Sequence, residues 1–286
     1  MIFESIGQYL KDGGTRMMFC SQIESSNRSN LIKCNKNVAF TPLQDKKNHL
    51  IGHMQLRTNG DHPLPNINIE PHSSPTRRST IMASGTVIVT GANGGLGSAF
   101  VQNLLSTSYH GIFTVRGLSD QSSGRLKQIL SLTSMSHAIV SLDLGSLAAV
   151  RAFAEDINAK VSNGEIPRIR ALVLNAGMQS FHGIKYTTDG IETTFAVNYL
   201  ANFLLVLLLL KSMDPEKGRI VTISSWSHDT SFYMNVHVTD KLVFRDPEVM
   251  AYPDYEDKKG EDWPAGMRRY GLSKLCLLMF VYPSRL

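Results

Sequence analysis

Two ionisable side chains near the end of the chain, Tyr270 and Lys274, have a spacing that suits proton transfer. Residues four apart lie on the same face of a helix, so the ammonium group would lie beside the phenol. A positive charge in that position favours phenolate and lowers a tyrosine pKa from about 10 towards the working range. Such a tyrosine can give a proton to a carbonyl oxygen or take one from an alcohol. Taken alone, the same spacing is more often an ordinary pair on an amphipathic helix.

A glycine-rich turn indicates a second function, the binding of phosphate. The run Gly91–Gly97 reads GANGGLG and lies between a predicted strand and a predicted helix. Gly91 permits a tight turn, Gly95 lets the backbone approach a pyrophosphate, and Gly97 allows the helix to pack closely on the strand. The helix N-terminus then offers N–H groups and a positive dipole end to the phosphates. The turn therefore predicts a dinucleotide site.

The residue that follows the second predicted strand bears on which dinucleotide binds. Folds that prefer NAD usually place an acid there, on the ribose 2′-hydroxyl. Here Arg116 lies 19 positions after Gly97, and no acid precedes it on the strand. A guanidinium suits a 2′-phosphate because it forms bidentate, charge-assisted hydrogen bonds. We therefore expect NADP(H) to be preferred, with NAD(H) as the alternative if Arg116 is simply exposed at a strand end.

Alternating strands and helices are predicted to position these residues. Short apolar runs predict five strands, at Thr86–Thr90, Ile112–Val115, Ala138–Leu142, Ala171–Leu174 and Ile220–Ile223. Helical patterns lie between them at Ser98–Ser106, Ser146–Ala159 and Ile191–Met213. This alternation predicts right-handed βαβ units, and therefore an α/β fold with a doubly wound, Rossmann-type parallel sheet. The apolar run Phe203–Leu210 fits a helix buried on that sheet, because a membrane span needs about 20 residues.

Composition excludes several other classes of protein. The chain has 286 residues, of which 42% are hydrophobic and 19% charged, so it can bury a core. Three cysteines, Cys20, Cys34 and Cys276, cannot form a disulfide framework. No cysteine and histidine cluster has metal-ligand spacing, so no metal is expected. We expect a cytoplasmic protein with no integral membrane segment.

The first 81 residues differ from the rest of the chain. They contain 10 Lys and Arg against 6 Asp and Glu, a balance of +4 within the net charge of +5. Because these charges are scattered rather than clustered, we expect no nucleic-acid partner. The weak apolar periodicity predicts a largely irregular segment, disordered or a spurious extension, with at most a short helix at Ile2–Lys11. Residues 82–286 then form the nucleotide-binding domain.

Six motifs in order resemble the short-chain dehydrogenase/reductase family, in its retinol-dehydrogenase-like and fungal reductase branches. They are the turn Thr90–Gly97, Asp143-Leu144, Asn175-Ala176-Gly177, Asn198, Ser224-Ser225, and the element Tyr270–Lys274. The resemblance implies an NADP(H)-dependent oxidoreductase that interconverts a carbonyl and an alcohol on a small molecule. It implies cofactor contacts from Gly91, Asn93, Gly95, Leu96, Gly97, Arg116, Asp143, Leu144, Asn175, Ala176, Gly177, Tyr270 and Lys274.

The resemblance also implies four catalytic residues, Asn198, Ser225, Tyr270 and Lys274. Tyr270 would be the acid/base, and Ser225 would polarise the substrate oxygen, with Ser224 as the alternative. Asn198 would hold a water on the proton path to Lys274, which would also bond the nicotinamide ribose. Family members often dimerise through the helices that carry Asn198 and Tyr270, so a homodimer is one expectation.

Two departures from the family pattern leave alternatives open. Ser225 and Tyr270 are 45 positions apart, a longer gap than usual. The added segment Trp226–Arg269 is either a substrate lid or an insertion that does not contact substrate. Leu286 follows Lys274 by 12 positions, so we expect the domain to lack the last strands of the family. The shortened helix counts against a homodimer, and the alternative function is an inactive truncated isoform that retains nucleotide binding.

Overall fold

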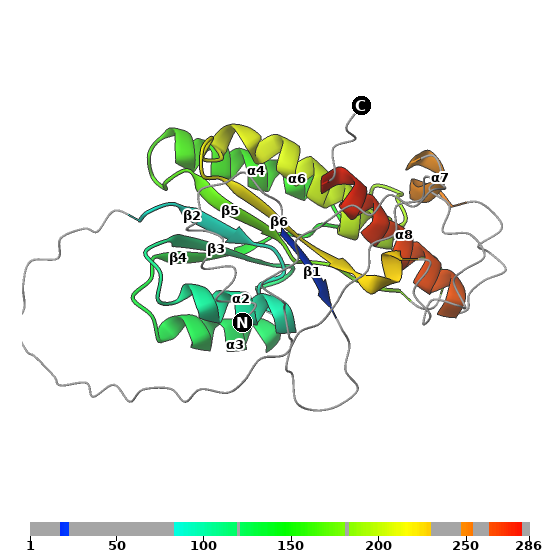
Figure 1. Ribbon diagram of the computed structural model, residues 1–286, viewed down its shortest axis with the longest axis horizontal. Coiled ribbons are helices and arrows are strands. Elements are labelled where there is room, and N and C mark those ends of the chain that lie inside the picture. Colours follow the sequence, from blue (N-terminus) through cyan, green and yellow to red (C-terminus); the bar gives the residue numbers. More distant parts are fainter. Residues whose placement is uncertain are drawn as a thin grey trace, which may run out of the picture.

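The computed structural model describes residues 83–118, 121–180, 183–229, 247–253 and 263–281, together with the backbone of 18–22. They form one parallel sheet with the strand order β1-β6-β5-β2-β3-β4 (Figure 1). The strands are β1 (Met18–Gln22), β2 (Thr86–Val89), β3 (His110–Val115), β4 (His137–Ser141), β5 (Ile169–Leu174) and β6 (Arg219–Ser225). The doubly wound α/β fold predicted from the sequence is confirmed, with β2 to β6 at the five predicted strand positions.

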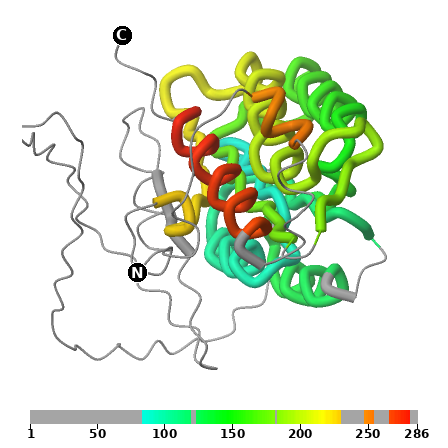
Figure 2. Tube along the Cα trace, turned by 90° about the vertical axis from the view of Figure 1, so that its right-hand side faces the viewer, coloured from blue at the N-terminus to red at the C-terminus, as the bar shows by residue number. Residues whose placement is uncertain are grey.

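Helices cover both faces of the sheet (Figure 1). The helices α2 (Gly95–Leu104) and α3 (Gln121–Ser131) lie on one face. The other face carries α4 (Leu147–Ser162), α6 (Ala201–Leu209) and α8 (Trp263–Val281). Figure 2 shows α8 in red beside the short α7 (Pro247–Ala251) in orange, and Cys276 Sγ of α8 lies 3.7 Å from Met250 Sδ of α7. The helix α8 therefore packs against both the sheet and the short outer helix α7.

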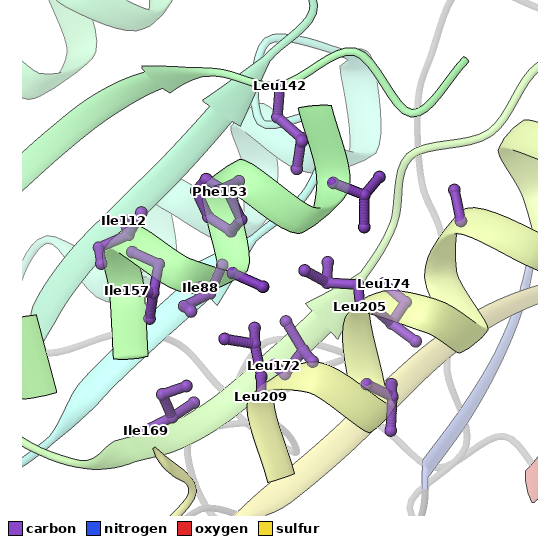
Figure 3. Close-up of a cluster of buried hydrophobic side chains, with 14 of the residues drawn as sticks. Ile88, Ile112, Leu142, Phe153, Ile157, Ile169, Leu172, Leu174, Leu205 and Leu209 are labelled. Carbon is purple, nitrogen blue, oxygen red and sulfur yellow. The ribbon is translucent and has the colours of Figure 1, made fainter. Parts of the chain in front are cut away.

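Two apolar clusters fill the space between the sheet and its helices. Val87 and Val89 of β2 belong to the cluster under α2 and α3, whereas Ile88 belongs to the cluster under α4 and α6. Figure 3 shows the second cluster, in which Leu205 and Leu209 of α6 lie near the strand residues. Successive strand side chains point to opposite faces, and both faces are covered. This explains why the strands appear in the sequence as unbroken apolar runs.

The predicted helix over 191–213 is interrupted. It consists of α5 (Thr193–Phe195), the π-helical turn η1 (Ala196–Leu200), α6, and the 3-10 turn η2 (Leu210–Ser212). Asn202 Nδ2 donates to the carbonyls of Val197 and Asn198, at 3.1 and 3.0 Å, and so satisfies carbonyls in the π-turn. The stretch Thr193–Ser212 is long and apolar enough to cross a membrane, but half of its most apolar window is buried inside the structure. A core helix passes the same test.

A strand from the N-terminal region forms one edge of the sheet. β1 pairs in parallel with β6, from Met18 opposite Val221 to Gln22 opposite Ser225. These five residues are an exception to the largely irregular segment that the sequence predicts, because strand pairing uses only backbone N–H and C=O groups. The helix predicted at Ile2–Lys11 lies outside the described residues.

Candidate active site

The glycine turn lies between β2 and α2, at the carboxyl edge of the sheet. Gly91 has a φ of +63°, and a Cβ there would lie 3.0 Å from the Cα of Ala176. A Cβ on Gly97 would lie only 2.1 Å from Gly91 O, whereas one on Gly95 would have nothing within 4 Å. α2 begins with the N-cap Gly94, without a side-chain cap or an acid in its first turn. The exposed Gly95 and the uncapped N–H groups leave room and donors for an anion.

The segment that follows β5 is hydrogen-bonded to the glycine turn. Asn175 Nδ2 donates to the carbonyls of Thr90 and Gly91, at 2.9 and 3.1 Å. Thr90 Oγ1 accepts the backbone N–H groups of Asn175 and Ala176, both at 3.0 Å. The residues Asn175, Ala176 and Gly177, which the family resemblance assigned to the cofactor, therefore lie beside the turn.

Other predicted cofactor residues lie further along the same edge of the sheet. Arg116 is exposed where β3 ends, and Asp143 is exposed after β4. The Asp143 carboxylate accepts the backbone N–H of Gly145 at 2.8 Å. Leu144 is a core residue, 5% exposed, so only its backbone is available there to a ligand. Asn93 and Leu96 are half-buried in the glycine turn.

Asn198 and Lys274 converge at Gly177. A Cβ on Gly177 would lie 3.2 Å from Lys274 Nζ and 3.3 Å from Asn198 Oδ1. Asn198 Oδ1 accepts the N–H of Met178 at 2.8 Å, and its Nδ2 donates to Met178 O and to Ser273 Oγ, both at 2.9 Å. The fully buried Asn198 therefore connects the π-turn η1 to the segment after β5 and to α8.

The side chain of Lys274 extends from α8 to the carboxyl end of β6. Its Nζ donates to Ile223 O at 2.9 Å and lies 5.6 Å from the centre of the Tyr270 ring. The residue is 4% exposed, and burial lowers the pKa of Lys274 to about 8. The amine is therefore charged at neutral pH and stands beside the Tyr270 ring, as a four-residue spacing on a helix requires.

The two serines at the end of β6 have different hydrogen bonds. Ser224 Oγ donates to the backbone carbonyl of Lys274 at 3.3 Å. Ser225 Oγ accepts both the hydroxyl of Ser227, at 2.9 Å, and its N–H, at 3.4 Å. A hydroxyl that accepts two hydrogen bonds still has its own proton to donate. Ser225 Oγ can therefore still donate to a further acceptor, whereas the proton of Ser224 Oγ is used by the carbonyl of Lys274.

The segment Trp226–Arg269 is described only in part, at 226–229, 247–253 and 263–269. In the short 3-10 turn η3 (Trp226–His228), the Nδ1 of His228 makes a hydrogen bond to Ser225 O. The choice between a lid and an insertion without substrate contact stays open. In the part of the chain that the structure describes, no group of three His, Cys, Asp or Glu residues could hold a metal ion.

The family follows from comparison with known proteins. The Rossmann-type fold and its glycine turn define a nucleotide-binding class. Within that class, residues 85–237 match the family model of the short chain dehydrogenases. The chain belongs to this family, which confirms the assignment predicted from the sequence.

The similar proteins include fungal and mammalian dehydrogenases. The short-chain dehydrogenase iccH of Talaromyces variabilis is 41% identical over 226 residues, 68% of this chain and 62% of that protein. Retinol dehydrogenase 14 of Mus musculus is 38% identical over 159 residues, 51% of this chain and 45% of that protein. The chain thus spans between two fifths and two thirds of the length of these relatives. An NADPH-bound carbonyl reductase from chicken fatty liver is 22% identical, with a TM-score of 0.48, over 69% of this chain and 68% of that one.

Proposed function

We propose that this chain is an NADP(H)-dependent oxidoreductase that interconverts a carbonyl and an alcohol, with Tyr270 as the proton-transfer group. The observation that best supports the proposal is the convergence of Lys274 Nζ and Asn198 Oδ1 at Gly177. Gly177 belongs to the segment that is bonded to the glycine turn. The Lys274 amine, the Tyr270 phenol and the glycine turn therefore lie at one edge of the sheet.

The residues of the glycine turn fit a dinucleotide. The open space at Gly95 and the uncapped first turn of α2 would receive the pyrophosphate. The exposed Arg116 would bind a 2′-phosphate, and the exposed Asp143 would contact the adenine. When bound, the nicotinamide supplies or accepts the hydride, and the protein supplies placement and electrostatics.

The side chains around Gly177 divide the remaining chemistry. Tyr270 gives its proton to the substrate oxygen in reduction and takes one in oxidation, with its phenolate favoured by the charge on Lys274. The Ser225 hydroxyl donates to the same oxygen. The Asn198 side chain is committed to Met178 and Ser273, so it supports the site. Its backbone carbonyl, which accepts from Asn202, has a second lone pair for a water.

The first test measures cofactor binding and turnover of the full chain. NADPH and NADH fluorescence titrations should give tighter binding of NADPH, and Arg116→Asp should reverse the order. Turnover is then followed at the nicotinamide absorbance with a panel of small aldehydes and ketones. Absence of binding would overturn the proposal, whereas binding without turnover would favour an inactive nucleotide-binding isoform.

The second test concerns the proton-transfer group. Tyr270→Phe should keep NADPH binding and lose turnover by about 100-fold or more, the usual contribution of a positioned acid/base. Tyr109→Phe is the matched control, since Tyr109 directly precedes β3, at the amino edge of the sheet and opposite the glycine turn. Equal turnover of the two variants would exclude Tyr270 from proton transfer.

A further inference from the structure

A buried ion pair lies beside the candidate site and was not predicted from the sequence. It joins Glu192, 1% exposed, to Arg269, 8% exposed. Arg269 Nε lies 3.8 Å from Glu192 Oε1. Arg269 immediately precedes Tyr270, and Glu192 begins the helical stretch that carries Asn198. The pair therefore connects the two elements that hold the proposed proton-transfer residues.

Glu192 organises the start of that stretch. As the N-cap of α5 it accepts the N–H of Thr194 at 3.0 Å and that of Phe195 at 2.7 Å. Its own N–H donates to Ala251 O of α7 at 2.8 Å, and its carbonyl accepts the N–H of Ala196 at 2.8 Å. One carboxylate thus starts the helix and faces a guanidinium of α8.

Arg269 has a second partner on the segment that follows β5. Its Nη2 donates to Gly183 O at 3.0 Å. The same segment is held at Met178 by both ends of the Asn198 amide. Arg269 therefore ties the first half of α8 to the carboxylate of Glu192 and to the segment that begins with the predicted cofactor residues.

We propose that Glu192 and Arg269 are positioning residues for Tyr270, an inference that rests on the proposed function. The ion pair sets the first half of α8 against α5. The Asn198–Ser273 hydrogen bond sets its second half against η1. These two contacts fix the rotation of α8 about its axis and its distance from the α5–η1 stretch. They therefore fix the position of the Tyr270 phenol. Buried ion pairs are a weak source of net stability, which is consistent with a role in geometry.

Three variants separate positioning from folding. Arg269→Met removes the charge and keeps much of the side-chain volume, and Arg269→Lys keeps the charge without the planar fork. The double variant Glu192→Gln, Arg269→Met removes both charges, so no unpaired charge is left buried. Lys160→Met is the matched control, because Lys160 forms an exposed ion pair with Asp156 at 2.7 Å on α4.

The measurements are kcat, KM, the Kd for NADPH and the melting temperature of the full chain. Arg269→Met should lower kcat by about 10- to 100-fold, because a misplaced reacting group costs that much, with little change in the Kd for NADPH. The double variant should recover melting temperature but not kcat, and Arg269→Lys should recover part of kcat. Lys160→Met should match the wild type.

The results that would overturn the positioning role differ from the result that would overturn the proposed function. Wild-type kcat in Arg269→Met, or full recovery of kcat in the double variant, would overturn the positioning role. Loss of the folded state in all three variants would make the pair a folding element and would overturn it too. If the wild type has no turnover, the proposed function fails instead. Amide exchange at Tyr270–Lys274 then still reports whether Arg269→Met loosens α8, and unchanged exchange would overturn the inference.

Discussion

Two alanine substitutions in the glycine turn should separate folding from cofactor binding. A Cβ on Gly97 would lie 2.1 Å from Gly91 O and 2.9 Å from the Cα of Ala92. These distances are far shorter than van der Waals contact, so backbone would have to shift by roughly 1 Å. Gly91 O also accepts hydrogen bonds from the Gly94 N–H and from Asn175 Nδ2, both at 3.1 Å. Gly97→Ala therefore disturbs packing and two hydrogen bonds together.

The expected loss of stability follows from these contacts. Overpacking costs about 1–3 kcal/mol, and each weakened hydrogen bond costs about 0.5–1.5 kcal/mol. The free energy of unfolding should fall by about 2–6 kcal/mol in Gly97→Ala. For a domain of about 200 residues this corresponds to a melting temperature lower by roughly 4–24 °C.

Gly95→Ala should behave in the opposite way. A Cβ there meets nothing within 4 Å, and alanine is favoured over glycine in a helix by up to about 1 kcal/mol. Its melting temperature should stay the same or rise slightly. Its methyl group, however, occupies the space proposed for the pyrophosphate, so NADPH should bind at least about 10-fold more weakly.

Thermal melts followed by dye fluorescence, and NADPH fluorescence titrations, test both variants. Gly124→Ala is the matched control, because Gly124 of α3 also faces open space, away from the glycine turn. It should change neither melting temperature nor affinity by much. Equal melting temperatures for Gly97→Ala and Gly95→Ala would refute the packing argument. Unchanged NADPH affinity in Gly95→Ala would refute the proposed pyrophosphate position.

Three further predictions concern pH, thiol reactivity and the edge strand. Lys274 has a pKa of about 8 in the folded protein, against 10.5 for an ordinary lysine side chain, so the unfolded state binds more protons between these two pH values. The free energy of unfolding of the wild type should therefore rise relative to that of Lys274→Met, by up to about 1.4 kcal/mol per pH unit between these values. A difference between the two proteins that does not change with pH in urea melts would contradict this. Burial raises the pKa of the Cys276 thiol to about 11, so peptide mass spectrometry should find maleimide on Cys276 only after unfolding, not in the native protein at pH 8. Because β1 is an edge strand that pairs only with β6 in the described sheet, the alternate amides of Met18–Gln22 that face β6 should be protected from hydrogen exchange. Complete exchange of all of them within seconds would rule out the pairing.

The strands were predictable because the sheet is buried on both faces. In unbroken apolar runs such as Val87–Val89 and Leu172–Leu174, successive side chains are buried in the clusters on opposite faces of the sheet. Every residue of such a run is therefore apolar, which allows the strand to be recognised in the sequence. The helix α3 was not predicted. Among its described side chains only Leu126 and Leu130 are buried apolar groups, four residues apart, which is too weak a pattern to establish a helical period. The strand β1 depends on a partner some 200 residues away in sequence, and local pattern does not report such pairing.

In the candidate site, too, some features could be predicted from the sequence and others could not. Local spacing predicted the glycine turn, and the order of motifs predicted Asn198, Tyr270 and Lys274 as site residues. The ion pair Glu192–Arg269 is a contact between distant segments, and no local rule joins its two residues. A partial signal did exist, since Glu192 directly precedes the run Thr193–Phe195, where an N-cap acceptor is expected. Capping explains Glu192 but not its partner.

A path of hydrogen bonds and one short stretch of backbone links the proposed cofactor turn to the proposed proton-transfer helix. It runs from Thr90 through Asn175 and Ala176 to Met178, from Met178 to Asn198, and from Asn198 through Ser273 to the carbonyl of Tyr270. In the proposed reaction, hydride and proton must reach adjacent atoms of one substrate, so the turn and the helix would have to keep a fixed separation. The segment Asn175–Met178 provides it, because it is bonded on one side to the turn and on the other to Asn198. Gly177 keeps this segment close to both polar groups, since a Cβ there would lie only 3.2 Å from Lys274 Nζ and 3.3 Å from Asn198 Oδ1.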